Sequence, residues 1–271
     1  MRWHSTWRKR RAQHPLTEAD NMAETVTGCM LIIGNEILSG RTQDTNLRHL
    51  AIELNELGVR MTEARVIPDV EEVIVAAVNE CRAKFDYVFT TGGIGPTHDD
   101  ITADCIAAAF GVPLVMDPSA EAIIRRREAP PDVMEARLRM ARVPEGSTLI
   151  ENGTGGPPGF QMENVFVMAG VPMVMQAMVA SLDATRIKGG RPVRSRTIGA
   201  YLGEGQIAAL LREVQGNHPD VDVGSYPFYR DTGYGTNLVV RGTDEAELEA
   251  IVEELRAIIV ELGGDPADGG I

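Results

Sequence analysis

The chain has 271 residues, of which 44% are apolar and 24% are charged, a composition typical of a globular protein and unlike that of extensively disordered chains. Its formal net charge of -13 excludes a large basic face, so a uniform polyphosphate such as DNA or RNA should be repelled. Any anionic ligand must therefore be held by local devices, namely helix N-termini, backbone amides or a bridging cation.

Residues 1–23 are expected to form a disordered basic leader. Residues 1–21 carry five basic and two acidic side chains, a net charge of +3, which leaves -16 for the rest of the chain. The leader has no apolar centre, so it resembles neither a secretory signal nor a membrane span, and no other stretch is long enough to span a membrane. Met22 lies just before the first expected strand, which favours a mis-assigned start or a disordered tail over an RNA-binding arm or a transit peptide.

The three cysteines, Cys29, Cys81 and Cys105, are widely spaced and form no C-x-x-C pair. This pattern predicts free thiols on the buried faces of one strand and two helices in a reducing compartment. We therefore expect a cytoplasmic protein without a membrane anchor.

From Thr27 onward, strands and helices alternate. Residues 27–34 (TGCMLIIG) form a continuous apolar run ending in glycine, as expected of a parallel strand buried on both faces. The alternation continues with strands at 59–67, 87–91 and 165–169, and with helices at 47–57, 70–81, 102–110 and from Pro172. These βα units predict an α/β fold with a doubly wound, mostly parallel sheet and helices on both faces.

The remaining segments predict the division into domains. The stretch 117–145 is polar and expected to be helical with a break at Pro130-Pro131, and 153–159 (GTGGPPG) is expected to be a loop. A linker at 186–194 separates an α/β domain (24–185) from a smaller domain (195–271). The smaller domain reads strand, helix, strand, strand, helix at 197–202, 203–215, 221–226, 236–241 and 244–262. That order predicts a small α+β domain whose sheet takes a further strand from elsewhere.

Ligands of open parallel sheets bind beyond the carboxyl ends of the strands, where the loops 34–46, 68–72 and 92–102 should converge. The third loop, TTGGIGPTHDD, is the most informative. Gly92 and Gly93 let the backbone approach a ligand closely, and the following helix offers free N–H groups and a positive dipole end. This predicts an anion site, although neither a Walker loop nor the G-x-G-x-x-G dinucleotide fingerprint is present.

Asp99 and Asp100 follow this loop and would repel a phosphate. Mg²⁺, which binds through one or two carboxylates together with substrate phosphates, would resolve the conflict. Either residue can instead cap the next helix. We expect Asp99 to be the cap and Asp100 to have the metal-binding or catalytic role, and we expect His98 to be a solvated loop residue.

The first and second loops contain further candidates. Asp69 and Glu72 fit a capping box, the favoured interpretation, although a cap at this edge can also face a ligand. Glu36 follows the first strand and is a candidate ligand or metal contact. Thr42 and Asn46 are hydrogen-bonding groups ahead of a helix, and Asp44 is expected to cap that helix.

Three motifs together resemble the molybdopterin-binding domain family. They are Gly34-Asn35-Glu36-Ile37-Leu38-Ser39-Gly40 with Asp44-Thr45-Asn46, then Pro68-Asp69, then Thr91-Gly92-Gly93-Ile94-Gly95-Pro96-Thr97 with Asp99-Asp100. The domain occurs in molybdopterin adenylyltransferases, in competence/damage-inducible protein A and in eukaryotic FAD synthases. The resemblance covers about residues 27–182, and the chain is most similar to the competence/damage-inducible and FAD-synthase branch. Its continuation at 195–262, with Gly224-Ser225-Tyr226-Pro227, resembles the FAD-synthase version.

The resemblance implies roles residue by residue. Asp69 and Asp100 match two aspartates that the adenylyltransferases use with Mg²⁺ and a nucleotide, and Asp100 would hold the metal. The pterin-phosphate cradle is matched by Gly92, Gly93, Gly95, Pro96 and Thr97, with Asp99 beside it. A second ligand-facing segment is matched around Gly153, Thr154 and Pro158. Family members are often trimers, so the resemblance implies a homo-oligomer.

Two departures from the family pattern leave two functions open. Asn35 stands where many relatives have an acid, and the sequence ends without an amide-hydrolysing or adenylyl-transferring domain. One hypothesis is a Mg²⁺-dependent enzyme that adenylylates molybdopterin or cleaves a dinucleotide such as ADP-ribose or FAD. The other is a non-catalytic module that binds a pterin or nucleotide as a carrier or regulator. The retained Asp69 and Asp100 favour the enzyme, and Asn35 favours the module.

Overall fold

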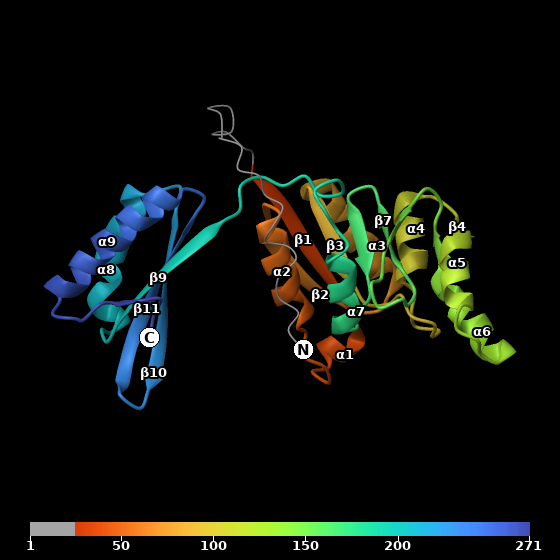
Figure 1. The fold of residues 1–271 in the computed structure, drawn as a ribbon, viewed down its shortest axis with the longest axis horizontal. Coiled ribbons are helices and arrows are strands. Elements are labelled where there is room, and N and C mark those ends of the chain that lie inside the picture. The colour runs from red at the N-terminus through yellow and green to blue at the C-terminus, as the bar shows by residue number, and fades with distance from the viewer. Residues whose placement is uncertain (1–24) are drawn as a thin grey trace.

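The computed structural model describes residues 25–271, which form two sheet-based units joined by an extended segment (Figure 1). The expected basic leader lies outside the described residues. Within the described part of the chain, no helix is both long enough and apolar enough to cross a membrane.

The first unit contains a six-stranded sheet in the order β2-β1-β3-β8-β7-β6. Its strands are β1 (Val26–Ile33), β2 (Val59–Ile67), β3 (Tyr87–Thr91), β6 (Thr148–Ile150), β7 (Gly159–Met162) and β8 (Val165–Met168). The four strands β2, β1, β3 and β8 are parallel, β7 pairs antiparallel with β8, and β6 pairs antiparallel with β7. The predicted mostly parallel α/β sheet is confirmed, and the β6–β7 hairpin is an addition that the sequence pattern did not reveal.

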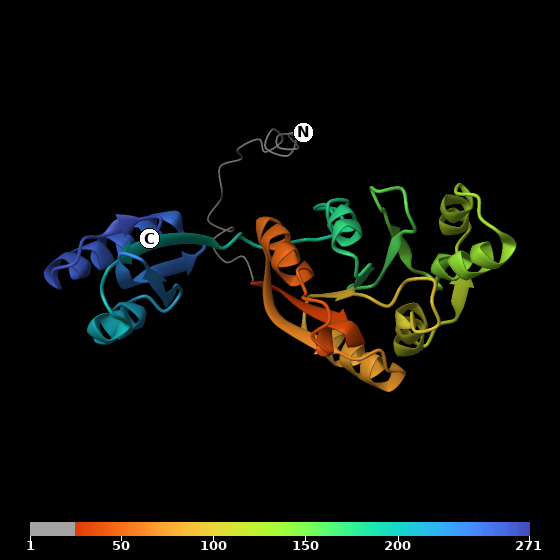
Figure 2. The ribbon, with the colours of Figure 1, turned by 90° about the horizontal axis from the view of Figure 1, so that it is seen from below.

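Helices cover both faces of this sheet (Figure 2). On one face α2 (Asn46–Glu56) and α7 (Pro172–Val179) pack over Met30 and Ile32 of β1. On the other face α3 (Glu71–Lys84) and α4 (Thr102–Phe110) pack over Leu31 and Ile33. Successive β1 side chains therefore enter two different cores, which explains its uninterrupted apolar sequence.

Strand β2 changes face part-way along its length. The pairing of β1 with β2 shifts between Gly28 and Cys29, so that Gly28 lies opposite Met61 but Cys29 lies opposite Glu63. The extra residue, Thr62, forms a bulge. As a result Val59 and Met61 pack with the α2 and α7 core, whereas Ile67 packs with the α3 and α4 core.

An extension between α4 and β6 contains a small two-stranded sheet and three short helical segments. They are β4 (Leu114–Met116), α5 (Pro118–Arg125), α6 (Pro131–Leu138), the 3-10 turn Arg139–Ala141 and β5 (Arg142–Pro144). The break at Pro130-Pro131 is confirmed, and Pro131 begins α6, where its missing N–H costs no hydrogen bond. The prediction that the helical stretch extends to residue 145 was wrong, because Arg142–Pro144 forms a strand that pairs antiparallel with β4.

The second unit is an antiparallel sheet in the order β10-β11-β9-β12, covered by two helices. Its elements are β9 (Arg194–Ala200), α8 (Glu204–Asn217), β10 (Asp222–Arg230), β11 (Gly233–Gly242), α9 (Glu245–Glu261) and β12 (Ala267–Asp268). It has a core of its own, centred on Ile198, Leu238 and Leu255. The predicted α+β order is confirmed, and the further strand is β12, which comes from the same chain.

The segment between the two units lies against the end of α2. The Gly190 amide donates to the Gly58 carbonyl at 2.8 Å, and the Asn55 side chain makes two hydrogen bonds with the Val193 backbone. A Cβ on Gly189 would lie 1.7 Å from the Leu57 carbonyl oxygen, so only glycine permits this approach.

Candidate functional site

The loop after β3 makes close backbone contacts with the two neighbouring strands. Gly92 has φ of 100°, and a Cβ there would lie 2.0 Å from the Ile33 carbonyl oxygen of β1. Its amide donates to the Met168 carbonyl of β8 at 3.3 Å. A side chain at this position would push β1 and β3 apart, which is the physical reason for glycine.

The next turn is closed onto the start of α4. Gly93 has φ of 65°, and Thr102 donates from its amide to the Gly93 carbonyl (2.9 Å) and from its hydroxyl to the Gly92 carbonyl (3.0 Å). These bonds direct the Gly92 and Gly93 carbonyls toward the start of α4. Among the described residues, nothing accepts a hydrogen bond from the amides of Gly93, Ile94 and Gly95. Consecutive free backbone amides are the groups that bind anions in proteins, so this loop is a candidate anion site.

Asp99 and Asp100 both accept hydrogen bonds from Thr97. The Thr97 hydroxyl lies 2.6 Å from Asp99 Oδ1 and also contacts Asp100 Oδ2, and the Thr97 amide donates to Asp100 Oδ2 at 2.8 Å. The bond from Thr97 holds the pKa of Asp99 below its ordinary value. The expected capping role of Asp99 was wrong, because α4 begins after Ile101 without any side-chain cap. The local Thr97 hydroxyl and amide bind these carboxylates instead.

Asp100 lines a small recess that sequence reasoning only partly anticipated. Its walls comprise Gly93, Ile94, Gly95, Asp100, Ala103, Asp104, Arg139, Met140, Arg142, Pro158 and Phe160. The structure thus brings together Gly93, Gly95 and Asp100 of the glycine-rich motif with Pro158 of the loop 153–159. Pro96, by contrast, lies exposed outside this recess.

Two arginines line this recess, Arg139 and Arg142, and neither was predicted as a site residue from the sequence. Arg142 forms an ion pair with Asp104 at 3.3 Å, and its buried Nε has no hydrogen-bond partner among the described residues. A signal was present in the sequence, since 125–142 contains six arginines and three acidic residues within a chain of net charge -13. Local basicity of this kind supplies the positive charge that an anionic ligand requires.

A larger cavity of about 970 Å³ adjoins the recess and shares Asp104, Arg139 and Arg142 with it. Its other walls come from α3, α4, β4, α5 and α6 and include the apolar side chains of Ile101, Met116, Met134 and Leu138. Three arginines (Arg125, Arg139, Arg142) and three acidic residues (Glu71, Asp104, Glu135) also line it. A space of this size, with an apolar wall and charged side chains of both signs, can hold a heterocycle that bears a phosphate.

Asp69 binds the loop after β1 and, contrary to the prediction, does not cap the helix that follows it. Its Oδ2 accepts a hydrogen bond from the Asn35 amide at 2.8 Å, at the first residue of α1 (Asn35–Leu38). The favoured capping box was wrong, because α3 begins after Val70 without a side-chain cap. Asp69 therefore joins the loops after β1 and β2, and no described contact joins it to Asp100.

Glu36 and Thr42 lie on the first loop near Asp69. The Glu36 carboxylate folds back over Gly34, with Oε1 2.6 Å from where a Gly34 Cβ would stand. It has no hydrogen bond or ion pair with any described residue, whereas its carbonyl accepts from the Thr42 amide at 3.0 Å. An unpaired carboxylate at this edge remains able to contact a ligand or a cation.

Asn46, the first residue of α2, is buried and forms a hydrogen bond with the loop after β8. It is 4% exposed, and its side-chain amide donates to the Gly170 carbonyl at 2.8 Å, just after β8. Its buried Oδ1 has no hydrogen-bond partner among the described residues. The expected capping role of Asp44 is confirmed, since its carboxylate accepts from the Leu47 amide at 3.0 Å.

The loop before β7 also lies at this edge. Asn152 Oδ1 accepts from the amide and hydroxyl of Thr154 at 3.0 and 2.7 Å, which fixes the turn. Gly153 lies beside Ala177 of α7, so only Pro158 of this loop reaches the Asp100 recess. The His98 side chain is 95% exposed, in agreement with its prediction as a solvated loop residue.

Comparison with known families accounts for most of the chain. The family described as "Probable molybdopterin binding domain" matches residues 29–188. The chain belongs to this family. A second family, "FAD synthase, middle domain", matches residues 192–262. The resemblance inferred from the glycine-rich motif is thereby confirmed for the first part, and the one inferred from Gly224-Ser225-Tyr226-Pro227 is confirmed for the second.

The relatives include archaeal and bacterial proteins. A protein of Archaeoglobus fulgidus is 32% identical over 85% of this chain and 96% of its own length. A CinA-like protein of Gemmatimonas aurantiaca is 38% identical over 68% of this chain but only 46% of its own length, so the match spans about half of that relative. The crystal structure of the protein CinA from Thermoplasma acidophilum is similar with a TM-score of 0.56 and 31% identity, over 60% of this chain and all of the other.

Proposed function

We propose that the chain binds a pterin or nucleotide phosphate at the loop 92–100 and catalyses Mg²⁺-dependent chemistry on a phosphoanhydride. The reaction is either adenylylation of molybdopterin or cleavage of a dinucleotide pyrophosphate such as that of ADP-ribose or FAD. The observation that carries the proposal is the row of free amides at Gly93, Ile94 and Gly95, next to Asp100 and two arginines. Membership of a molybdopterin-binding family supports the same ligand class.

The surrounding residues suit each part of such a ligand. The free amides can donate hydrogen bonds to the phosphate oxygens and so bind a phosphate without a charged side chain. Arg139 and Arg142 bring positive charge to the recess, where Arg142 also pairs with Asp104. The heterocycle then occupies the adjoining cavity between α4 and α6.

The donor atoms of the recess fit Mg²⁺. Asp100 Oδ1 accepts no hydrogen bond from the described residues, whereas Oδ2 is fixed by Thr97. A hard carboxylate oxygen on a partly exposed side chain is the kind of ligand Mg²⁺ prefers. Bound there, Mg²⁺ would connect Asp100 to the phosphates and neutralise charge on the phosphoryl group. Thr97 positions the Asp100 carboxylate, and Asp69 positions the first loop.

The test is a mass-spectrometric assay of the purified protein with Mg²⁺ and ATP plus molybdopterin, ADP-ribose or FAD. AMP released from ADP-ribose or FAD would identify a pyrophosphatase, and ATP consumed only with molybdopterin would identify an adenylyltransferase. We expect Asp100→Ala to abolish the metal-dependent turnover while leaving the melting temperature nearly unchanged, because Asp100 is partly exposed. Normal turnover by a folded Asp100→Ala protein would refute the metal site.

A specific observation also supports the non-catalytic alternative. Asn35 stands where the family resemblance implies an acid, and its backbone N–H, which any residue would supply there, already occupies one oxygen of Asp69. Tight binding of one of these ligands without turnover, measured by calorimetry and thermal stabilisation, would establish the binding module.

We further propose that the protein is a cytoplasmic homo-oligomer and that the oligomer is a trimer. Beyond the family resemblance, apolar side chains are exposed around the carboxyl edge of the sheet, with Leu38 at 52%, Val171 at 59% and Met173 at 68%. Such side chains are typical of surfaces that become buried on association. Light scattering during size-exclusion chromatography measures the mass directly, and a monomer at micromolar concentration would refute the trimer.

A further inference from the structure

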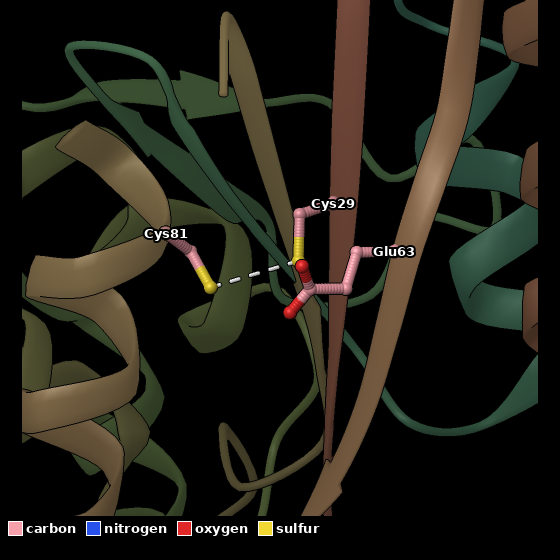
Figure 3. Close-up of side chains that lie close together, drawn as sticks. All are labelled: Cys29, Glu63 and Cys81. Carbon is pink, nitrogen blue, oxygen red and sulfur yellow. Dashed lines mark hydrogen bonds between the residues drawn. The ribbon is translucent and has the colours of Figure 1, made fainter. Parts of the chain in front are cut away.

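Two thiols and one carboxylate meet on the α3 face of the sheet, away from the loops described above (Figure 3). Cys29 of β1 and Cys81 of α3 are free and fully buried, with their sulfurs 3.6 Å apart. The Glu63 carboxylate of β2 lies beside them, and one ligand atom from each residue falls within 4.8 Å of the others. Cys29 precedes Gly34 by five residues, which places the cluster about 16 Å from the carboxyl edge.

The bulge in β2 is what places Glu63 in this cluster. Thr62 is the additional residue, and through it Glu63 lies opposite Cys29 and on the same face. Without the bulge, Thr62 would pair with Cys29 and the alternation along β2 would turn Glu63 toward the opposite core. Bulges are uncommon between parallel strands and are often used to redirect a side chain near a functional site.

The spacing of the sulfurs matches tetrahedral coordination. With a Zn–S bond of about 2.3 Å, two sulfurs 3.6 Å apart define an S–Zn–S angle of roughly 103°, close to the tetrahedral angle. Zn²⁺ is bound by thiolates and carboxylates alike and has no geometric preference from its d-electrons. A disulfide would require these sulfurs to move to about 2 Å from one another.

The charges around the cluster also fit a divalent cation. Cys29 and Cys81 are free cysteines, and a metal binds them as thiolates. Binding would replace two S–H bonds by two S–Zn bonds and release two protons to solvent. One Zn²⁺ therefore replaces two protons, and the charge of this buried region does not change.

The Glu63 carboxylate is held in place by the side chains of Arg65 and Lys84. Glu63 Oε1 accepts from Arg65 Nε at 2.5 Å, and its Oε2 accepts from Lys84 Nζ at 2.6 Å, while Arg65 also binds Glu80. Outer-shell partners of this kind fix the orientation of a metal-binding carboxylate. Glu63 is partly exposed and lies on an edge strand, whereas both cysteines are buried, so its carboxylate is the part of the cluster nearest to solvent.

We propose that Cys29, Cys81 and Glu63 form a structural Zn²⁺ site that joins β1, β2 and α3. The site is independent of the proposed Mg²⁺ site, because its ligands are soft thiolates and it lies in the interior rather than at the sheet edge. The three residues supply three of the four ligands of a tetrahedral site, so the fourth position would be open on the side of the partly exposed Glu63.

The test uses reduced, metal-free protein titrated with Co²⁺, whose thiolate complexes absorb in the near ultraviolet. We expect one equivalent of Co²⁺ to produce this band, Zn²⁺ to displace it, and Zn²⁺ to raise the melting temperature. Cys29→Ser and Cys81→Ser should abolish the band, and Glu63→Gln should weaken Co²⁺ binding at least tenfold. Glu63→Gln is the informative variant if a buried cysteine substitution prevents folding.

Two matched variants serve as controls. Cys105→Ser removes the other buried thiol, and Glu80→Gln removes a partner of Arg65 without changing a ligand. Both should bind Co²⁺ as the wild type does. The proposal fails if reduced wild-type protein gives no thiolate band, if Glu63→Gln binds Co²⁺ with unchanged affinity, or if Cys105→Ser loses the band. Recovery of Cys29 and Cys81 as a disulfide that binds no Co²⁺ after reduction would also overturn it.

Discussion

Gly93 shows how a single hydrogen atom in place of a side chain determines the shape of the candidate site. Its φ of 65° already disfavours other residues, and a Cβ would also lie 2.2 Å from the Thr102 hydroxyl oxygen. That hydroxyl holds the Gly92 carbonyl, so a substitution at Gly93 disturbs the loop that presents the free amides.

We therefore expect Gly93→Ala to be more damaging than the matched change Gly111→Ala. Gly111 has the same φ of 65° but open space where a Cβ would be, so its substitution costs only the backbone strain of about 1–2 kcal/mol. Gly93→Ala adds overpacking, which costs about 1–3 kcal/mol more. Urea denaturation of both variants gives the difference, and equal losses of stability would show that Thr102 moves away freely.

Asp69 can be tested for charge and for geometry separately. Its carboxylate accepts a hydrogen bond from the Asn35 amide, and an asparagine oxygen can accept the same bond without the charge. If Asp69 only positions the first loop, Asp69→Asn should retain most of the turnover and Asp69→Ala should lose about tenfold. Steady-state kinetics of the two variants decides the question, since equal losses would assign a catalytic or metal-binding role to the charge.

At the scale of elements, the starts of β1 and β3 are joined by one carboxylate. Asp86 Oδ2 accepts from both the amide and the hydroxyl of Thr27 at 2.7 Å, and these bonds lower the pKa of Asp86 below its ordinary value of 3.8. The lowered pKa means that the stabilisation is fully present above pH of about 4 and is lost as the pH falls through the lower folded-state value.

We expect Asp86→Asn to destabilise the protein at pH 7, and we expect this loss of stability to shrink progressively as the pH falls below about 4. The reason is that the wild-type carboxyl becomes protonated as the pH falls and loses its advantage. Thermal unfolding of both proteins between pH 2 and pH 7 measures the difference. A gap between the two melting temperatures that does not narrow on acidification would contradict this assignment.

The long elements could be predicted from sequence because their signals are local. The apolar run of β1 and the periodic leucines of α2 report burial directly, and the strand 87–91 was predicted with its observed bounds. Strands β4, β5 and β6 have only three residues each, too few to show a period of two. Their pairing depends on partners elsewhere in the chain.

The candidate site was predictable only in part, for a related reason. The glycines and Asp100 lie in one motif, so their proximity follows from the chain itself. Arg139 and Arg142 join them only through the fold, because α6 and β5 return to α4. The spacing of Asp69 and Glu72 predicted a helix cap, but the Asp69 carboxylate binds the backbone N–H of Asn35 instead. Residue spacing carries no information about a contact between two separate loops.

At the scale of the whole molecule, the two units have separate cores and are linked through surface contacts. Arg60 of β2 forms an ion pair with Asp222 of β10 at 2.6 Å, and the two side chains are 50% and 62% exposed. An exposed pair of this kind contributes little because water and salt screen it.

We expect a double-mutant cycle of Arg60→Ala and Asp222→Ala to give a coupling energy of about 0.2–1 kcal/mol that decreases with added salt. Chemical denaturation at low and high ionic strength measures it. A coupling above about 2 kcal/mol, or one unaffected by salt, would show that this pair fixes the second unit to the first.

The order of strands in the first sheet has a consequence for synthesis of the protein. Strand β3 pairs with β1 on one side but with β8 on the other, and Val88 pairs with Val165, a separation of 77 residues (88 to 165). At roughly 5–20 residues per second, the ribosome takes about 4–15 s to supply that partner. During this interval one edge of a strand that is buried in the finished protein remains open to other chains, so the nascent protein is most vulnerable to aggregation before β8 emerges.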